Sequence, residues 1–459
     1  MRSFRFSRRS IAPLYLLLCL LLGGASAAGF IANLALQWLA LPLLGWALLA
    51  HGRDPGEPAT RSLMVLALAL AAFMIIQLIP LPPSLWTLLP GRRATADGFA
   101  MLGQPAPWLP LSLAPENALA SLLWLLPAFA VLVAMLRLGA FRASWLATAV
   151  LVVVSLSVPI GALQIVGGDP SNWYFYEITN NGQAVGFFAN SNHAATLLVV
   201  AIPFLAALQL SLVQRQRSPR RSSALLVITT AAYLVIAVGL VINFSIAGLG
   251  LAVPVTIASF MLLKTENKGR VRLGGIATLI FAVAAVAAIL IGPVHNNLTD
   301  KLTGPASGLD QLSRKVSIAK TLDAAADFAP FGSGVGTFQA VYRGKEAPAD
   351  VIGTYMNHAH SDLAEIMLET GAIGVGLLAL LLIWWARRAR ALWSVAVPDY
   401  FARAATIASG AIMAHSLVDY PLRTAAISAL FAACLALMAQ PHPFTTRRRD
   451  DNDVRHLSV

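Results

Sequence analysis

Charge is scarce in this sequence. Only 12% of its 459 residues are Asp, Glu, Lys or Arg, whereas soluble globular proteins carry about 25%. Hydrophobic residues make up 58% of the chain, so there are too few charged side chains to coat a water-soluble globule of this length. The composition instead suits a protein whose surface largely faces lipid.

Cysteine is scarce as well, and we find no internal repeat. The two cysteines, Cys19 and Cys434, both lie in apolar runs, which argues against a disulfide framework and says little about the redox compartment. A net charge of +12 could indicate a nucleic-acid-binding protein. We exclude nucleic acid as a partner because Lys and Arg form short clusters that alternate with apolar runs, as membrane orientation requires.

A helix needs about 20 predominantly apolar residues to cross a bilayer, and twelve runs in the chain approach that length. They lie at 11–30, 31–50, 62–81, 116–136, 144–166, 193–212, 224–242, 244–263, 274–293, 363–385, 402–420 and 424–440. The sequence therefore predicts an all-α polytopic membrane protein with about 12 transmembrane helices.

Basic residues are divided unevenly between the two sides of this predicted bundle. If the N-terminus is cytoplasmic, the inside segments hold 24 of the 33 Lys and Arg residues, and the outside segments hold nine. The inside segments are 1–10, 51–61, 137–143, 213–223, 264–273, 386–403 and 441–459. Because basic residues accumulate in cytoplasmic loops, we predict that both termini lie in the cytoplasm.

We expect five regions along the chain. They are transmembrane helices 1–5 (1–166), transmembrane helices 6–9 (167–293), a large periplasmic loop (294–362), transmembrane helices 10–12 (363–440) and a cytoplasmic tail (441–459). Within the large loop, 311–326 predicts an amphipathic helix on the membrane surface. The N-terminal run with Ala25-Ser26-Ala27 resembles a signal peptide, but a second run follows closely, so we expect it to be retained as the first helix.

Histidines gather on the predicted outer side. Five of the eight lie in outer segments or at outer helix ends: His193, His295, His358, His360 and His415. Imidazole exchanges protons near neutral pH, so we expect the chemistry of the protein on this side.

The first motif, Gly186–His193, runs directly into an apolar helix. We expect Asn192 to cap this helix and His193 to lie in its first turn. The simplest interpretation is a turn followed by a cap. The functional interpretation is a polar patch at the mouth of a cavity.

The second motif is Ser313-Arg314-Lys315, followed by the glycine-rich run Pro330–Phe338 and by Tyr342. The glycine-rich run lacks the Gly-Lys-Ser/Thr ending of a phosphate-binding loop, which argues against a nucleotide site, and it is most simply a turn. Arg314 places a fixed positive charge in an outer segment. That charge suits a phosphate or pyrophosphate, or else contact with lipid headgroups.

The third motif, Tyr355–Gly371, brings two histidines and three acids to the start of an apolar helix. Asp362, Glu365 and Glu369 recur at helical spacing, so they share one face and need partners or a water-filled cavity near the membrane. His358 and His360 with these acids could bind zinc. No second ligand pair appears at a known spacing, so we expect no metal.

The fourth motif is His415–Arg423, at the outer end of the eleventh predicted helix. We expect Asp419 and Arg423 to pair with each other. His415 lies about one turn deeper and is not explained by that pair.

Together the four motifs resemble the O-antigen ligase superfamily over roughly 185–425. This superfamily includes lipopolysaccharide O-antigen ligases, some Wzy-type polysaccharide polymerases and bacterial protein O-oligosaccharyltransferases. The resemblance implies a GT-C-like membrane glycosyltransferase with a large periplasmic loop and no metal or cofactor. It implies an undecaprenyl-pyrophosphate-linked glycan as donor, a hydroxyl of lipid A-core or another glycan as acceptor, and an inverting transfer among membrane lipids.

The resemblance also implies roles for single residues. Arg314 matches the arginine that holds the pyrophosphate, and His360 matches the histidine that acts as base. Further substrate contacts are expected from Asn192, His193, His358, Lys315, Tyr342, His415 and Arg423. The family often has Ser-Arg-x-Gly where this chain has Ser245-Ile246-Ala247-Gly248. Part of the phosphate clamp is then missing or is supplied elsewhere, by Arg423 or Lys315, and this leaves a polymerase as the alternative.

Two other classes of protein have similar composition. A secondary transporter also has about a dozen helices, but it usually shows two related halves and ionisable residues near mid-membrane. Here we find no repeat, and the polar residues gather at the outer edge. A scaffold protein of the envelope would leave the outer histidines unexplained.

Overall fold

The structure is a computed structural model that describes residues 7–26, 31–50, 57–168, 172–214, 219–264, 305–346 and 356–442. It is mostly helical. The bundle helices are α1 (Ile11–Leu22), α2 (Ile31–Leu49), α3 (Pro58–Ile76), α6 (Pro115–Leu138), α7 (Ala143–Gly167), α8 (Ser191–Val213), α9 (Pro219–Asn243), α10 (Ile246–Lys264), α15 (Asp362–Ser394), α16 (Tyr400–His415) and α17 (Ala425–Ala439). Each coincides with one predicted apolar run, and the run at 274–293 lies outside the described residues.

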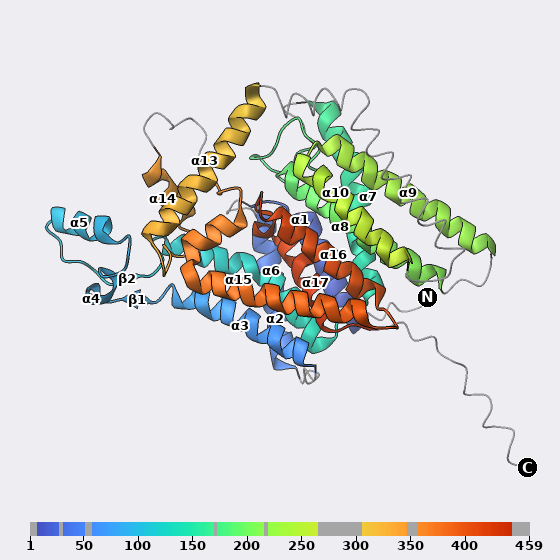
Figure 1. Ribbon diagram of the computed structural model, residues 1–459, viewed down its shortest axis with the longest axis horizontal. Coiled ribbons are helices and arrows are strands. Elements are labelled where there is room, and N and C mark those ends of the chain that lie inside the picture. Colours follow the sequence, from blue (N-terminus) through green and yellow to red (C-terminus); the bar gives the residue numbers. More distant parts are fainter. Residues whose placement is uncertain are drawn as a thin grey trace, which may run out of the picture.

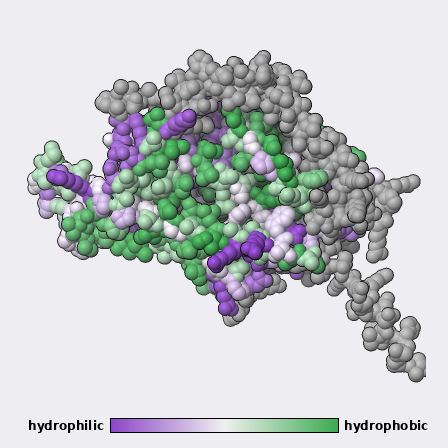
Figure 2. Space-filling view, viewed as in Figure 1, coloured by the Kyte–Doolittle hydropathy of each residue, from purple (hydrophilic) through white to green (hydrophobic). Residues whose placement is uncertain are grey.

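Among the described residues, seven helices are long and apolar enough to cross a membrane: α2, α3, α6, α7, α8, α9 and α15. Their outward sides carry large apolar residues that would be unfavourable in water, such as Leu68 (62% exposed) and Val227 (68% exposed). Figure 2 shows apolar residues over much of the visible face of the bundle. These observations confirm a polytopic membrane protein.

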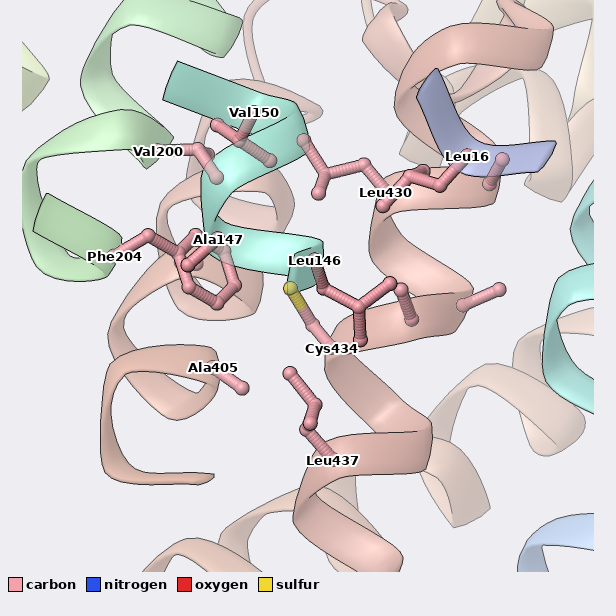
Figure 3. Close-up of a cluster of buried hydrophobic side chains, with 14 of the residues drawn as sticks. Leu16, Leu146, Ala147, Val150, Val200, Phe204, Ala405, Leu430, Cys434 and Leu437 are labelled. Carbon is pink, nitrogen blue, oxygen red and sulfur yellow. The ribbon is translucent and has the colours of Figure 1, made fainter. Parts of the chain in front are cut away.

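Helix α8 lies at the centre of the bundle. Within its apolar window 83% of the residues are buried, against 17–44% in the other six candidate spans. Val200 and Phe204 of this helix face side chains of α7, α16 and α17 (Figure 3). Helices α16 and α17 are rich in buried alanines, and small residues let helix backbones approach closely in a membrane protein.

Hydrogen bonds show which helix ends meet. At one end, Arg388 Nε donates to the Met438 carbonyl at 2.6 Å, and Gln440 Nε2 donates to the Leu136 carbonyl at 2.9 Å. At the same end, Gln214 Nε2 donates to the Tyr400 hydroxyl at 2.5 Å. These residues lie in or beside the segments predicted to share the cytoplasmic side. The ends of α6, α8, α15 and α17 and the start of α16 therefore lie together, as the distribution of basic residues predicts for these helices.

The other end carries the elements that we call the cap: α13 (Pro305–Asp327), α14 (Phe338–Lys345) and the turn between them. The cap lies at the upper left in Figure 1. Helix α13 includes residues 311–326, which the sequence predicts as an amphipathic helix. Two short strands, β1 (Pro80–Leu81) and β2 (Leu109–Pro110), pair antiparallel beside the short helices α4 (Pro83–Trp86) and α5 (Arg93–Met101). This small lobe is a local departure from the predicted all-α fold.

Candidate active site

The candidate site lies at the cap end, where α8 begins. The side chain of Asn190 caps this helix by accepting the Asn192 N–H at 2.8 Å. The expectation that Asn192 is the cap was therefore wrong, whereas His193 lies in the first turn as predicted. Because Asn190 takes the cap position, the Asn192 amide is available for contacts with other helices.

Asp419, in the turn after α16, is the hub of the site and is fully buried. Its Oδ2 accepts a hydrogen bond from Asn192 Nδ2 at 2.5 Å. Its Oδ1 lies 3.7 Å from His360 Nδ1 and 3.9 Å from His193 Nε2. Two segments that are far apart in the sequence, around Asn192 and around His360, thus converge on a carboxylate from a third.

The charge of Asp419 follows from these neighbours. Burial alone would favour the neutral acid, but the facing imidazoles of His360 and His193 hold the pKa of Asp419 below its usual range. The group is therefore a carboxylate at neutral pH. A carboxylate beside an imidazole can fix the orientation of the ring and stabilise its protonated form.

His360 is the imidazole of this site that is most open to solvent. Its side chain is 23% exposed, against 15% for His358 and 1% for His193. Its backbone has a φ of 54°, in the left-handed region that few residues other than glycine adopt. It lies immediately before Ser361, whose hydroxyl accepts the Ala364 N–H and caps α15, so the cap of that helix helps to fix the position of His360.

Tyr420 holds the imidazoles together. The centroid of its ring lies 5.0 Å from that of His193, 4.3 Å from that of His358 and 5.3 Å from that of His360. Neither Tyr420 nor Asp419 was predicted from the sequence as a site residue. The available signal was their position four and five residues after His415, in the turn that follows a helix end.

A deeper layer lies below this hub. His415 is fully buried, and its Nδ1 lies 2.7 Å from the Thr196 hydroxyl. The carbonyl oxygen of the Asn192 side chain accepts a hydrogen bond from Ser245 Oγ at 2.6 Å. These contacts tie the starts of α8 and α10 to the end of α16.

A second centre surrounds Arg423. Its Nε lies 3.5 Å from Asp362 Oδ1 and 3.4 Å from Glu365 Oε2, and its Nη2 lies 3.4 Å from Glu369 Oε2. The prediction that the three acids share one face and need a partner is confirmed. The expected pair of Asp419 and Arg423 was wrong, because the turn at Pro421–Arg423 directs the two side chains to different partners.

The charge of Arg423 is matched by its neighbours. Burial would favour the neutral form, but Glu365, Glu369 and Asp362 together hold the pKa of Arg423 above its usual range. Glu365 also lies 3.0 Å from His358 Nδ1. Among the described residues no group of three His, Cys, Asp or Glu side chains has the arrangement of a metal site, and His358 and His360 face different carboxylates.

The glycine-rich run contacts protein rather than solvent. The backbone N–H groups of Gly336 and Phe338 both donate to Glu369 Oε1, at 3.0 and 3.2 Å. The Val335 N–H donates to Gln77 Oε1 at 2.8 Å. These N–H groups have internal acceptors, so the run acts here as a turn that joins the cap to the bundle.

Other predicted site residues lie in the cap. Arg314 belongs to α13, but its side chain lies outside the described residues, as does His295. Lys315 is exposed on the same helix. Tyr342 is 5% exposed and stacks on Phe338 with ring centroids 5.2 Å apart, in the small apolar core of the cap.

The fold and the site together describe a polytopic membrane protein with a buried imidazole and carboxylate centre at its cap end. Residues 231–379 match the family described as O-Antigen ligase. This match confirms the resemblance to the O-antigen ligase superfamily, and it supports a membrane function of the ligase and polymerase kind. The matched stretch includes His358, His360 and the three acids, whereas Asn192, Asp419 and Arg423 lie outside it. No curated protein matches the chain.

Proposed function

We propose that this protein is a membrane glycosyltransferase of the O-antigen ligase type. It would transfer a glycan from undecaprenyl pyrophosphate to a hydroxyl of lipid A-core or of a similar acceptor. The observation that carries the proposal is the pairing of His360, the most exposed imidazole of the site, with the buried Asp419 carboxylate at 3.7 Å. His360 also lies within the stretch that matches the family.

The chemistry follows from these two groups. His360 takes the proton of the acceptor hydroxyl, whose oxygen then attacks the anomeric carbon of the donor sugar. The bond between that carbon and the pyrophosphate oxygen breaks, and one displacement inverts the anomeric centre. Asp419 orients the imidazole and stabilises it once it is protonated, and a positioned base of this kind contributes about 10²–10⁴-fold to the rate.

The leaving pyrophosphate needs a positive partner. Arginine stays charged beside lipid and can bind phosphate through two parallel hydrogen bonds. Arg423 is less suited to this task, because three carboxylates already lie within 3.5 Å of it. We therefore assign the pyrophosphate to Arg314 on α13, assisted by the exposed Lys315. Neither metal nor cofactor takes part in the proposed step.

The proposed function also requires one orientation of the protein in the membrane. The cap would face the periplasm across the bacterial inner membrane, both termini would face the cytoplasm, and about twelve spans would form a GT-C-like bundle. The distribution of 24 inside and nine outside basic residues supports this arrangement, and so does the grouping of loops at the two ends of the bundle.

A Wzy-type polymerase is the second candidate, and Ile246 in place of the family arginine supports it. The acceptor would then be another glycan, with the same base and leaving group. Glycan gels of a deletion strain separate the two, since loss of a ligase leaves long lipid-linked polymer, and loss of a polymerase leaves single repeat units. The family match supports glycan transfer over the transporter alternative.

Replacement of His360 by alanine tests the mechanism. We expect a loss of about 10²–10⁴-fold in transfer rate, measured with purified protein in liposomes that contain lipid-linked glycan and acceptor. The matched control is His442→Ala, at the opposite end of the bundle, where the ring contacts Phe141 and the Gln440 carbonyl. A wild-type rate for the His360 variant at equal membrane levels would show that the assigned role is wrong.

A further inference from the structure

Glu369 faces two centres at once and is only 3% exposed. One carboxylate oxygen accepts the N–H groups of Phe338, the first residue of α14, and of Gly336, two residues before it. The other oxygen lies 3.4 Å from Arg423 Nη2. Thr337, at the N-terminal cap position of α14, makes no side-chain cap bond, so a carboxylate from another helix satisfies these donors.

The contact lies where α15 bends. Gly371, two residues after Glu369, has a φ of 56° and interrupts the helix. The turn between α13 and α14 is bonded to this bend: the Ser333 and Gly334 N–H groups donate to the carbonyls of Leu368 and Glu369, at 2.9 and 3.0 Å. The cap is therefore docked on the bend through both backbone and side chain.

The two cap helices, α13 and α14, are held to each other. Lys345 of α14 lies 2.8 Å from Asp323 and 2.6 Å from Asp327, both on α13. Phe328, Phe338 and other apolar residues form a small shared core below them. The position of α14 on Glu369 thus sets the position of α13, the helix that carries Arg314 and Lys315.

The chain of contacts continues to the imidazoles. Arg423 also lies 3.4 Å from Glu365 Oε2, whose other oxygen lies 3.0 Å from His358 Nδ1. His358 packs on Tyr420, the ring that also contacts His360. Glu369 therefore contacts the start of α14 through one oxygen and Arg423 through the other, and Arg423 contacts the other two acids of α15.

We infer that Glu369 and Arg423 form an electrostatic latch that holds the cap at a fixed position over the imidazole centre. Glu369 is a positioning residue: it acts through the cap and does not touch the reacting atoms. The contacts of the latch hold whatever the protein does, whereas its effect on the lipid-linked donor rests on the proposed function. Loss of the latch would misplace the positive side chains of α13 relative to His360.

Amide hydrogen exchange tests the latch without reference to activity. In Glu369→Ala the Gly336 and Phe338 N–H groups lose their acceptor, so we expect exchange in 333–345 to quicken about tenfold or more. Glu369→Gln keeps an oxygen acceptor and loses the attraction to Arg423, so a smaller rise is expected. The control is Glu57→Ala, which removes a carboxylate at the same 3.4 Å from an arginine, Arg388, at the opposite end.

Transfer kinetics on the same variants test positioning. We expect Glu369→Ala to raise the donor KM and lower kcat, by up to about 100-fold for misplacement of a reacting group. The acceptor KM should stay near wild type, and Glu369→Gln should restore part of the loss. A purely structural role would instead reduce the amount of active protein and leave both KM values unchanged.

The outcomes separate the latch from the proposed function. Unchanged exchange in 333–345 would overturn the latch, and if the alanine variant does not fold, the glutamine variant decides by the same measurement. Faster exchange with wild-type kinetics would overturn the positioning role. Faster exchange in a protein whose wild type transfers no glycan would overturn the proposed function and leave the latch in place.

Discussion

Replacing Arg423 with glutamine leaves three buried carboxylates without their shared counter-charge. Asp362, Glu365 and Glu369 are 6%, 0% and 3% exposed, so water cannot replace the guanidinium. Removal of one partner from a buried ion pair typically costs about 3–5 kcal/mol. Each contact is 3.4–3.5 Å long, and at an effective dielectric constant of about 20 a pair at that distance attracts by about 5 kcal/mol.

The three attractions do not add, because the carboxylates also repel one another and desolvation opposes them. We therefore expect Arg423→Gln to lower the free energy of unfolding by about 3–5 kcal/mol at neutral pH. The raised pKa of Arg423 means that its contribution is fully present below the usual arginine pKa and is lost only in strong alkali. In the variant the acids must take up protons to fold, so its deficit should shrink as the pH falls.

The assay is denaturant titration of detergent-solubilised protein, followed by fluorescence of its ten tryptophans. A double-mutant cycle with Glu365→Gln should recover part of the loss, since one of the stranded charges is then absent. The control is Arg93→Gln, whose side chain is 94% exposed beside Asp97, and which should stay within about 0.5 kcal/mol of wild type. A loss below about 1 kcal/mol for Arg423→Gln, the upper range for surface pairs, would refute the reasoning.

Two further substitutions follow from local geometry. Gly371→Ala places a Cβ 2.2 Å from the Pro330 carbonyl oxygen at a positive φ, so we expect it to lower the free energy of unfolding by more than about 2 kcal/mol. The control is Gly376→Ala on the same helix, whose Cβ meets nothing within 4 Å and which should be neutral or stabilising. Thermal unfolding compares the two variants. Asn192→Asp would place a second carboxylate against Asp419 across the present 2.5 Å contact. We expect the unfolding midpoint and the transfer rate of this variant both to be lower at pH 8 than at pH 6. Equal transfer rates at the two pH values would contradict the contact.

Hydrophobic runs predicted most of the helices because lipid imposes a simple rule on sequence. Every backbone polar group in the bilayer must be bonded within its own helix, so a spanning segment is apolar along its whole length. The division between α9 and α10 was also predicted, although their apolar runs nearly touch. Asn243 ends α9, and its amide donates to the Ala184 and Ser191 carbonyls at 2.6 and 2.9 Å.

The partners of the charged residues could not be predicted in the same way. Asp419 and Arg423 are four residues apart, a spacing that favours a pair on a helix. A short 3₁₀ turn at Pro421–Arg423 replaces that helix, and each side chain instead meets groups from segments more than fifty residues distant. Local periodicity carries no information about such contacts, so the hub of the site was missed.

Part of the candidate site lies outside the residues that match the family. The matched residues, 231–379, supply His360 but not the carboxylate that faces it. Asp419 comes from the turn after α16, and Asn192, which hydrogen-bonds to Asp419, comes from the first turn of α8. An imidazole without this carboxylate would keep its place in the sequence and lose the group that orients it. If His360 is the base, its activity therefore depends on the packing of α16 against α8 as much as on the matched stretch itself.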